Sequence, residues 1–121
     1  MRAAVIQTVT SVLGWDLARK SQVVKTVDEE AEISCLVGRG KLREEVWQDS
    51  ASGCIVRYNL AFVNHLMYRG DNTRVLGYDV AHGYHHRHFM GETEDINFPG
   101  YEELSKRFFR EVAALRKKGS I

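Results

Sequence analysis

The sequence predicts an α+β fold with an antiparallel β-sheet of about five or six strands, a C-terminal amphipathic helix packed on one face, and an N-terminal helix. Three observations favour this class. Several short runs in the middle of the chain alternate apolar and polar residues, which is the period of a half-buried strand. Near the end, apolar residues recur every three or four positions, the period of a helix. The length of 121 residues and the hydrophobic fraction of 44% fit one packed domain. Strands followed by a covering helix form two layers.

We expect residues 1–121 to form this single domain in three parts. Residues 1–30 form an N-terminal extension, residues 31–98 are mostly β, and residues 99–118 hold the C-terminal helix. The N-terminal helix is predicted over residues 3–13, where apolar side chains have helical spacing.

The first strands are predicted from two short alternating runs. Residues 21–27 and 32–37 are separated by the acidic residues 28–30, which favours a hairpin with an acidic turn. The glycines of residues 38–40 then interrupt the pattern. Residues 41–48 follow as a strand with Leu42 and Val46 on one face.

The later strands have clearer patterns. Residues 53–63 keep a period of two over ten positions and form the best strand in the chain. A polar turn at residues 70–73 precedes residues 74–80, whose β-branched and aromatic content favours a strand. Residues 84–90 can also be extended.

The C-terminal helix is predicted by an apolar stripe of Tyr101, Leu104, Phe108, Val112 and Leu115. Asn97 or a neighbour is expected to cap it, with Pro99 near the first turn and Gly119 past the end. Its cations have two interpretations: a solvated, basic helix end, or a phosphate-binding surface made of Lys106, Arg107 and Arg110.

Charge and cysteine usage narrow the class of protein. The formal net charge of +1 argues against a wholly basic nucleic-acid-binding protein but allows a local basic groove. No apolar run approaches the roughly 18 residues of a membrane span, so no membrane association is expected. Cys35 and Cys54 lack the spacing of metal or redox motifs. We expect a cytoplasmic protein; the oligomeric state is open, and a dimer is plausible.

Four of the five histidines lie within residues 82–88. On an extended strand, His86 and His88 point to one face about 6.6 Å apart, and His85 and Arg87 point to the other. A neutral and a protonated imidazole side by side can accept and donate protons, which is what cleavage of RNA needs. Arg87 would then steady the phosphate, and Asp79, next to Tyr78, could orient a histidine.

Two other interpretations of the cluster stay open. His86 and His88 could be metal ligands, with Asp79, His82 or His85 completing a set around zinc or iron. The histidines could also be structural, as surface residues that form local hydrogen bonds. Acid–base chemistry by the histidines requires no cofactor, whereas metal ligation requires a divalent metal.

The order of these features resembles the TumE family. The segments that carry the resemblance are Arg57 to Val63, Val75 to Asp79, His85 to His88, and the helix start at Tyr101 to Leu104 after Phe98 and before Phe108-Phe109. Together they lie within about residues 41–115, and the Tyr78-Asp79 pair followed by His86-Arg87-His88 is the most specific part.

This resemblance implies a cytoplasmic toxin of a type II toxin-antitoxin module, neutralised by a cognate antitoxin. Our hypothesis for its activity is a ribonuclease, an mRNA interferase-like enzyme, with His86, His88, Arg87, Asp79 and Tyr78 as catalytic residues. RNA would contact His85, Lys106, Arg107 and Arg110. The alternatives are a non-catalytic protein-binding module with a structural histidine cluster, and a small metal enzyme that uses His86, His88 and Asp79.

Overall fold

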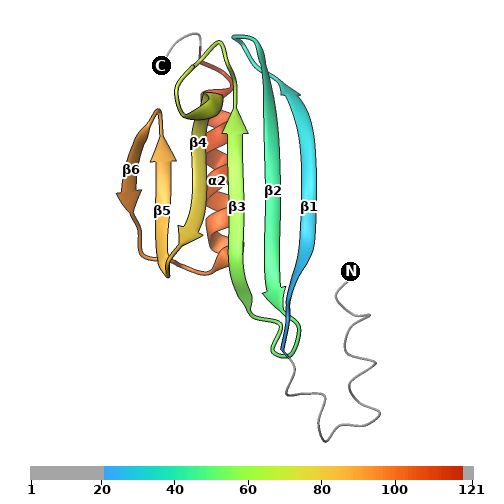
Figure 1. The fold of residues 1–121 in the computed structure, drawn as a ribbon. Coiled ribbons are helices and arrows are strands. Elements are labelled where there is room, and N and C mark those ends of the chain that lie inside the picture. Colours follow the sequence, from blue (N-terminus) through green and yellow to red (C-terminus); the bar gives the residue numbers. More distant parts are fainter. Residues whose placement is uncertain (1–20, 119–121) are drawn as a thin grey trace, which may run out of the picture.

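A computed structural model describes residues 21–118 as one antiparallel sheet with one helix. The strands lie side by side in the order of the sequence, each antiparallel to the next (Figure 1). Their bounds are β1 Val23–Ser34, β2 Arg39–Asp49, β3 Ile55–Val63, β4 Arg74–Ala81, β5 Tyr84–Phe89 and β6 Glu92–Asp95. A short 3-10 turn, η2, spans Asp71–Thr73 before β4, and α2 spans Tyr101–Leu115. The predicted α+β class, with six strands and a C-terminal helix, is confirmed.

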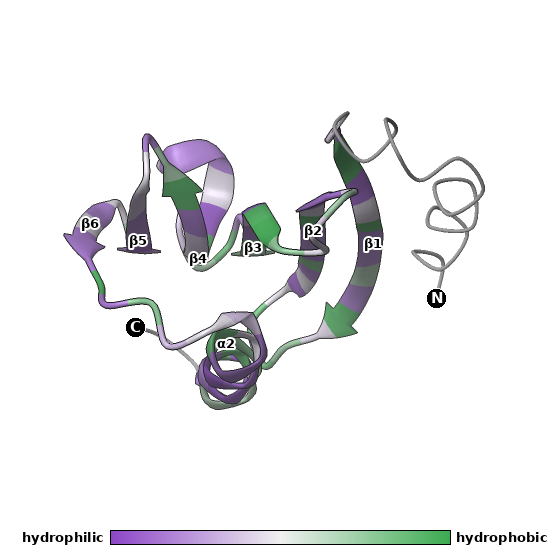
Figure 2. Cartoon of the chain, turned by 90° about the horizontal axis from the view of Figure 1, so that it is seen from below, coloured by the Kyte–Doolittle hydropathy of each residue, from purple (hydrophilic) through white to green (hydrophobic). Residues whose placement is uncertain are grey.

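Helix α2 packs on one face of the sheet, and no described helix covers the other face (Figure 2). We call these the helix face and the open face. Leu104, Phe108, Val112 and Leu115 of the predicted apolar stripe are buried against β3 and β4. Their partners come from alternate strand positions and include Tyr58, Leu60, Phe62, Leu76 and Tyr78. The core is therefore one layer thick, between α2 and the centre of the sheet.

Strand β1 is the described element that differs most from the sequence prediction. The predicted helix over residues 3–13 lies outside the described residues. The predicted hairpin over residues 21–37 is wrong, because β1 is one continuous strand through the acidic residues 28–30. It also crosses the expected boundary between residues 30 and 31. Asp28 lies opposite Glu45, and Glu30 lies opposite Arg43. The cations of β1 and β2 compensate the acidic run, so it need not leave the sheet to form a turn.

The remaining elements follow the predicted runs, with two differences. Strand β6 was not predicted, because all four of its residues are exposed and three are acidic. Helix α2 is preceded by Gly100, not capped by Asn97. Gly100 has a φ of 103°, which favours glycine, and its carbonyl accepts a hydrogen bond from the Leu104 amide. Two glutamates in the first turn complement the helix dipole.

Candidate functional site

The alternation of β4 and β5 divides the predicted catalytic residues between the two faces. Asp79 pairs in register with His86, and Gly77 pairs with His88, so both histidines and the aspartate lie on the open face. Tyr78 pairs with Arg87, and both side chains contact α2 on the helix face. The sheet therefore brings Asp79, His86 and His88 together and separates them from the other two predicted catalytic residues.

Asp79 is the centre of the open-face group, which we call the Asp79 site: Asp79, His86 and His88. Its Oδ1 lies 3.0 Å from Nε2 of His88 and 3.8 Å from Nδ1 of His86. The two imidazole ring centres are 6.0 Å apart, close to the spacing that an extended strand predicts. The side chains of His86 and His88 are 23% and 17% exposed, so solvent reaches both rings. A substrate atom could therefore reach them too.

Each member of the Asp79 site also has a further polar neighbour. Nε2 of His86 lies 3.3 Å from Oδ1 of Asp95, and Nδ1 of His88 lies 3.2 Å from Oγ1 of Thr93. Both of these neighbours come from β6. The guanidinium of Arg74 lies 3.4 Å from Oδ2 of Asp79. Each ring nitrogen of His86 and His88 thus faces an oxygen, and these contacts orient the two imidazole rings.

Arg74 reaches Asp79 because of two local features of β4. The register of β3 and β4 shifts between Phe62 and Val63, and this places Arg74 on the same face as Gly77. A Cβ at Gly77 would lie only 2.8 Å from Cδ of Arg74, so the arginine lies across the glycine. Arg74 also pairs with Asp71, whose Oδ2 lies 2.8 Å from Nε of Arg74.

On the helix face, Tyr78, Arg87 and Glu111 form a connected group. Glu111 accepts hydrogen bonds from the Tyr78 hydroxyl and from Arg87, the latter at 2.9 Å. Arg87 Nε also donates to the Tyr78 oxygen at 3.1 Å. Burial, together with Glu111, raises the pKa of Tyr78 to about 12. Arg87, predicted to steady a phosphate between His86 and His88, is thus a partner of α2 on the other side of the sheet.

His85 also lies on the helix face, in an aromatic stack. Its ring lies parallel to that of Phe98 at 4.2 Å, and its Nδ1 is 2.8 Å from the hydroxyl of Tyr58. Burial, and to a lesser extent the charge of His86, lowers the pKa of His85. These contacts tie the segment before α2 to the sheet, which is a structural role.

The predicted RNA-binding cations are not next to the Asp79 site. Lys106, Arg107 and Arg110 belong to α2, and the sheet lies between this helix and the open face. Lys106 pairs with Glu102, and Arg107 lies over the ring of Tyr78. If α2 binds a polyanion, it does so on a different surface from His86 and His88.

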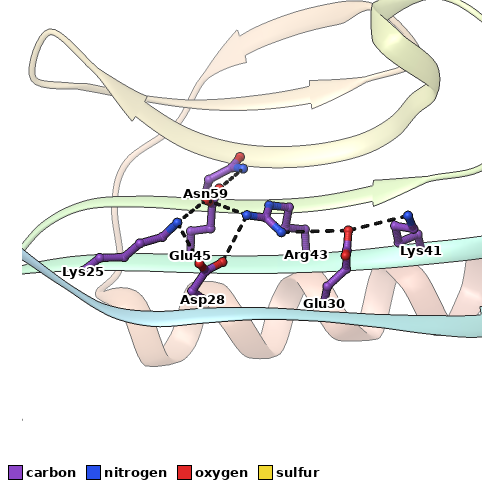
Figure 3. Close-up of polar contacts among 7 residues, drawn as sticks. All are labelled: Lys25, Asp28, Glu30, Lys41, Arg43, Glu45 and Asn59. Atoms are coloured by element: carbon purple, nitrogen blue, oxygen red, sulfur yellow. Dashed lines mark hydrogen bonds and ion pairs between the residues drawn. The ribbon is translucent and has the colours of Figure 1, made fainter. Parts of the chain in front are cut away.

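The open face carries a second polar group, on β1 to β3 (Figure 3). Glu45 lies within 3.0 Å of nitrogens of Lys25, Arg43 and Asn59. Asn59 pairs in register with Asp79, so this group adjoins the Asp79 site on the same face. Nearby, Trp47 lies between the cations of Lys25 and Arg57, at 5.0 and 4.6 Å from the ring centre. No local sequence pattern predicts this group, because its members come from three strands.

Two hollows are lined by described residues other than those of the Asp79 site. One, of about 380 Å³, is lined by Arg87, Phe89, Met90, Glu92, Thr93 and Glu94. A smaller one, of about 120 Å³, lies where Phe109 of α2 meets β1 and β2. Neither is lined by Asp79, His86 or His88.

Comparison with known proteins decides the family. A family model described as Toxin TumE matches residues 16–116, which is most of the chain. The chain belongs to the TumE toxin family. This confirms the resemblance carried by β3, β4, β5 and the start of α2. Neither curated proteins nor solved structures gave a match. Within residues 21–118, no helix of this TumE-family chain is long and apolar enough to cross a membrane.

Proposed function

We propose that this TumE-family chain is the toxin of a type II toxin-antitoxin module and that it cleaves RNA with His86 and His88. One observation carries the enzymatic part of the proposal: both imidazoles and Asp79 converge on the open face, and each of their side chains is partly exposed. The toxin would act in the cytoplasm, and its protein partner would be the cognate antitoxin.

The chemistry is a transphosphorylation. One imidazole takes the proton of a ribose 2′-hydroxyl, and the 2′-oxygen attacks the adjacent phosphorus. The bond from phosphorus to the 5′-oxygen breaks, and the other histidine, as imidazolium, protonates that oxygen. The products are a 2′,3′-cyclic phosphate and a free 5′-hydroxyl. Asp79 orients the imidazoles, and exchange with water restores their protonation.

The cation beside this chemistry is Arg74, not Arg87. Arg74 already contacts Asp79 and is on the open face, where a phosphate that reaches His86 and His88 would lie. Arg87 is occupied by Glu111 and Tyr78 on the helix face. We therefore assign the stabilisation of the phosphate to Arg74 instead of Arg87.

Other side chains of the open face could contact a bound RNA strand. Trp47, with Lys25 and Arg57 over its ring, offers an aromatic surface next to two cations. Trp47 is on β2 and His86 is on β5, three strands away, which is about 14 Å at the usual spacing. A single strand of RNA that crosses the sheet could contact both.

The test is cleavage of labelled RNA by the purified full chain in the presence of EDTA. We expect cleavage by the wild type, with a cyclic phosphate at the new 3′ end. The His86→Ala and His88→Ala variants should each lose about 10²- to 10⁴-fold in rate. His65→Ala is the matched control, because His65 is exposed and outside the site. Full activity of the His86 and His88 variants, or no cleavage by the wild type, would contradict the proposal.

The second candidate function is a non-catalytic binding module. It is favoured by apolar side chains exposed outside the Asp79 site, including Leu36, Leu66 and Phe109. Exposed apolar side chains of this kind can take part in binding another protein. Toxicity in cells separates the two functions: a binding module keeps its toxicity with both His86→Ala and His88→Ala, whereas the ribonuclease loses it.

A further inference from the structure

We propose that Asp79, His86 and His88 also bind a divalent transition metal of the zinc class, and that a bound ion blocks the proton transfers assigned to the two histidines. The binding stands on geometry alone. The blocking effect rests on the proposed ribonuclease function.

Two of the three donor-to-donor distances are close to those that such an ion requires. Zinc binds imidazole nitrogens and carboxylate oxygens at about 2.0–2.1 Å, so tetrahedral donors lie about 3.3 Å from one another. Here Oδ1 of Asp79 lies 3.0 Å from Nε2 of His88 and 3.8 Å from Nδ1 of His86. All three donor atoms lie within 4.8 Å of one another. A small rotation of the partly exposed His86 ring would complete the set.

The outer hydrogen bonds of the site also match those of metal centres. A histidine that binds a metal through one nitrogen usually donates its other N–H to a carboxylate or another oxygen. His86 offers Nδ1 to the site while its Nε2 faces Asp95, and His88 offers Nε2 while its Nδ1 faces Thr93. Both rings can therefore adopt the tautomer that metal binding requires without losing their outer partner. Arg74 holds the second oxygen of Asp79 and leaves Oδ1 for the ion.

Local charge favours a cation. Asp71, Asp79 and Asp95 bring three negative charges near the site, and Arg74 brings one positive charge, which leaves two negative charges when the imidazoles are neutral. A dication would balance them. The guanidinium of Arg74 opposes the ion, but its charge is shared between Asp71 and Asp79.

The donor types select the class of metal. Two imidazoles and one carboxylate suit zinc and its neighbours, whereas magnesium and calcium prefer oxygen ligands alone. The open face leaves the remaining coordination positions to water. A bound ion would occupy the lone pairs of Nδ1 of His86 and Nε2 of His88, and these nitrogens could then neither accept nor deliver a proton.

The binding test uses zinc sulfate and protein that was purified without a nickel column, treated with EDTA and dialysed. Isothermal titration calorimetry should give one equivalent of zinc per chain. Cobalt in place of zinc should give an absorption band of a low-coordinate site. His86→Ala, His88→Ala and Asp79→Asn should each abolish the stoichiometric binding, and the control His65→Ala should retain it. Far-UV circular dichroism checks that each variant is folded.

Asp95→Asn tests the outer partner separately. Asp95 is 81% exposed, so this change should leave the fold intact. Loss of an outer carboxylate typically weakens metal affinity about 10- to 100-fold, and we expect a loss in that range. Affinity equal to that of the wild type would overturn the assigned role of Asp95. No zinc binding by the wild type, or unchanged binding by the His86 and His88 variants, would overturn the site itself.

The RNA assay then tests the consequence. One equivalent of zinc should stop cleavage, and excess EDTA should restore it. Stoichiometric binding without inhibition would overturn the blocking effect. Stoichiometric binding by a chain that cleaves no RNA with or without EDTA would contradict the proposed ribonuclease and overturn blocking, while the metal site itself would stand.

Discussion

The ionised carboxylate of Glu45 is the most strongly stabilised acid on the open face, and Glu45→Gln tests how much it stabilises the sheet. Burial alone would raise the pKa of Glu45, but hydrogen bonds from Lys25, Asn59 and Arg43 outweigh burial and lower the pKa to about 2, from an ordinary value of 4.5. Figure 3 shows these contacts joining β1, β2 and β3. The substitution keeps the shape of the side chain and removes its charge.

The size and pH dependence of the effect follow from this pKa. The full shift would correspond to roughly 3 kcal/mol of unfolding free energy. The side chains of Lys25 and Arg43 are 31% and 38% exposed, and solvent screening reduces the expected contribution to about 1–2 kcal/mol. Because the pKa is lowered in the folded state, the contribution is complete above pH 4.5 and disappears as the pH falls towards 2.

The assay is urea unfolding of the wild type and of Glu45→Gln at several pH values. We expect a difference of about 1–2 kcal/mol at pH 7 and a much smaller one near pH 2. The control is Glu32→Gln, because Glu32 and Arg39 form a mostly exposed pair, which should contribute less than about 0.5 kcal/mol. A Glu45→Gln effect no larger than the control, or one that does not depend on pH, would refute the reasoning.

Three further predictions concern the helix face and the support of Arg74. Arg87→Ala should cost about 2–3 kcal/mol in urea unfolding, because it leaves Glu111 without its cation in a partly buried position; an unchanged midpoint would contradict this. Phe108→Ala should cost about 3–5 kcal/mol, because Phe108 of α2 is fully buried against the sheet, and a loss below 1 kcal/mol would argue against that packing. Gly77→Ala should cost about 1–3 kcal/mol by pushing Arg74 aside, and thermal unfolding would measure it.

Alternation alone was enough to predict which histidines share a face. The period of two in residues 84–90 placed His86 and His88 together, and the same rule placed Arg87 opposite. It could not say which face α2 would cover. That depends on the buried positions of β3 and β4, where Tyr58, Leu60 and Tyr78 set the helix face. The sequence therefore predicts one RNA-binding surface for the cations of α2 and for His86 and His88. In the structure the helix is on one face of the sheet and the two histidines are on the other.

The polar partners of the site depend on registers that no local pattern reveals. Thr93 and Asp95 reach the histidines because β6 pairs with β5, yet four exposed residues give no strand signal. Arg74 is on the open face only because the register shifts beside Val63. The acidic residues 28–30 are predicted as a turn because two of their cations, Lys41 and Arg43, belong to the next strand, whereas only Lys25 lies on the same strand. Each of these features depends on long-range pairing.

The division between the two faces gives a way to separate function from stability in this TumE-family chain. Residues of the helix face, such as Tyr78, Arg87 and Glu111, connect the sheet to α2, so we expect their loss to lower the folded fraction. The side chains of His86 and His88 are partly exposed on the open face, away from the core under α2. A change there that abolishes activity at unchanged unfolding free energy must act through the chemistry of the open face. Loss of toxicity in an Arg87 variant is therefore evidence about catalysis only when its stability has been measured as well.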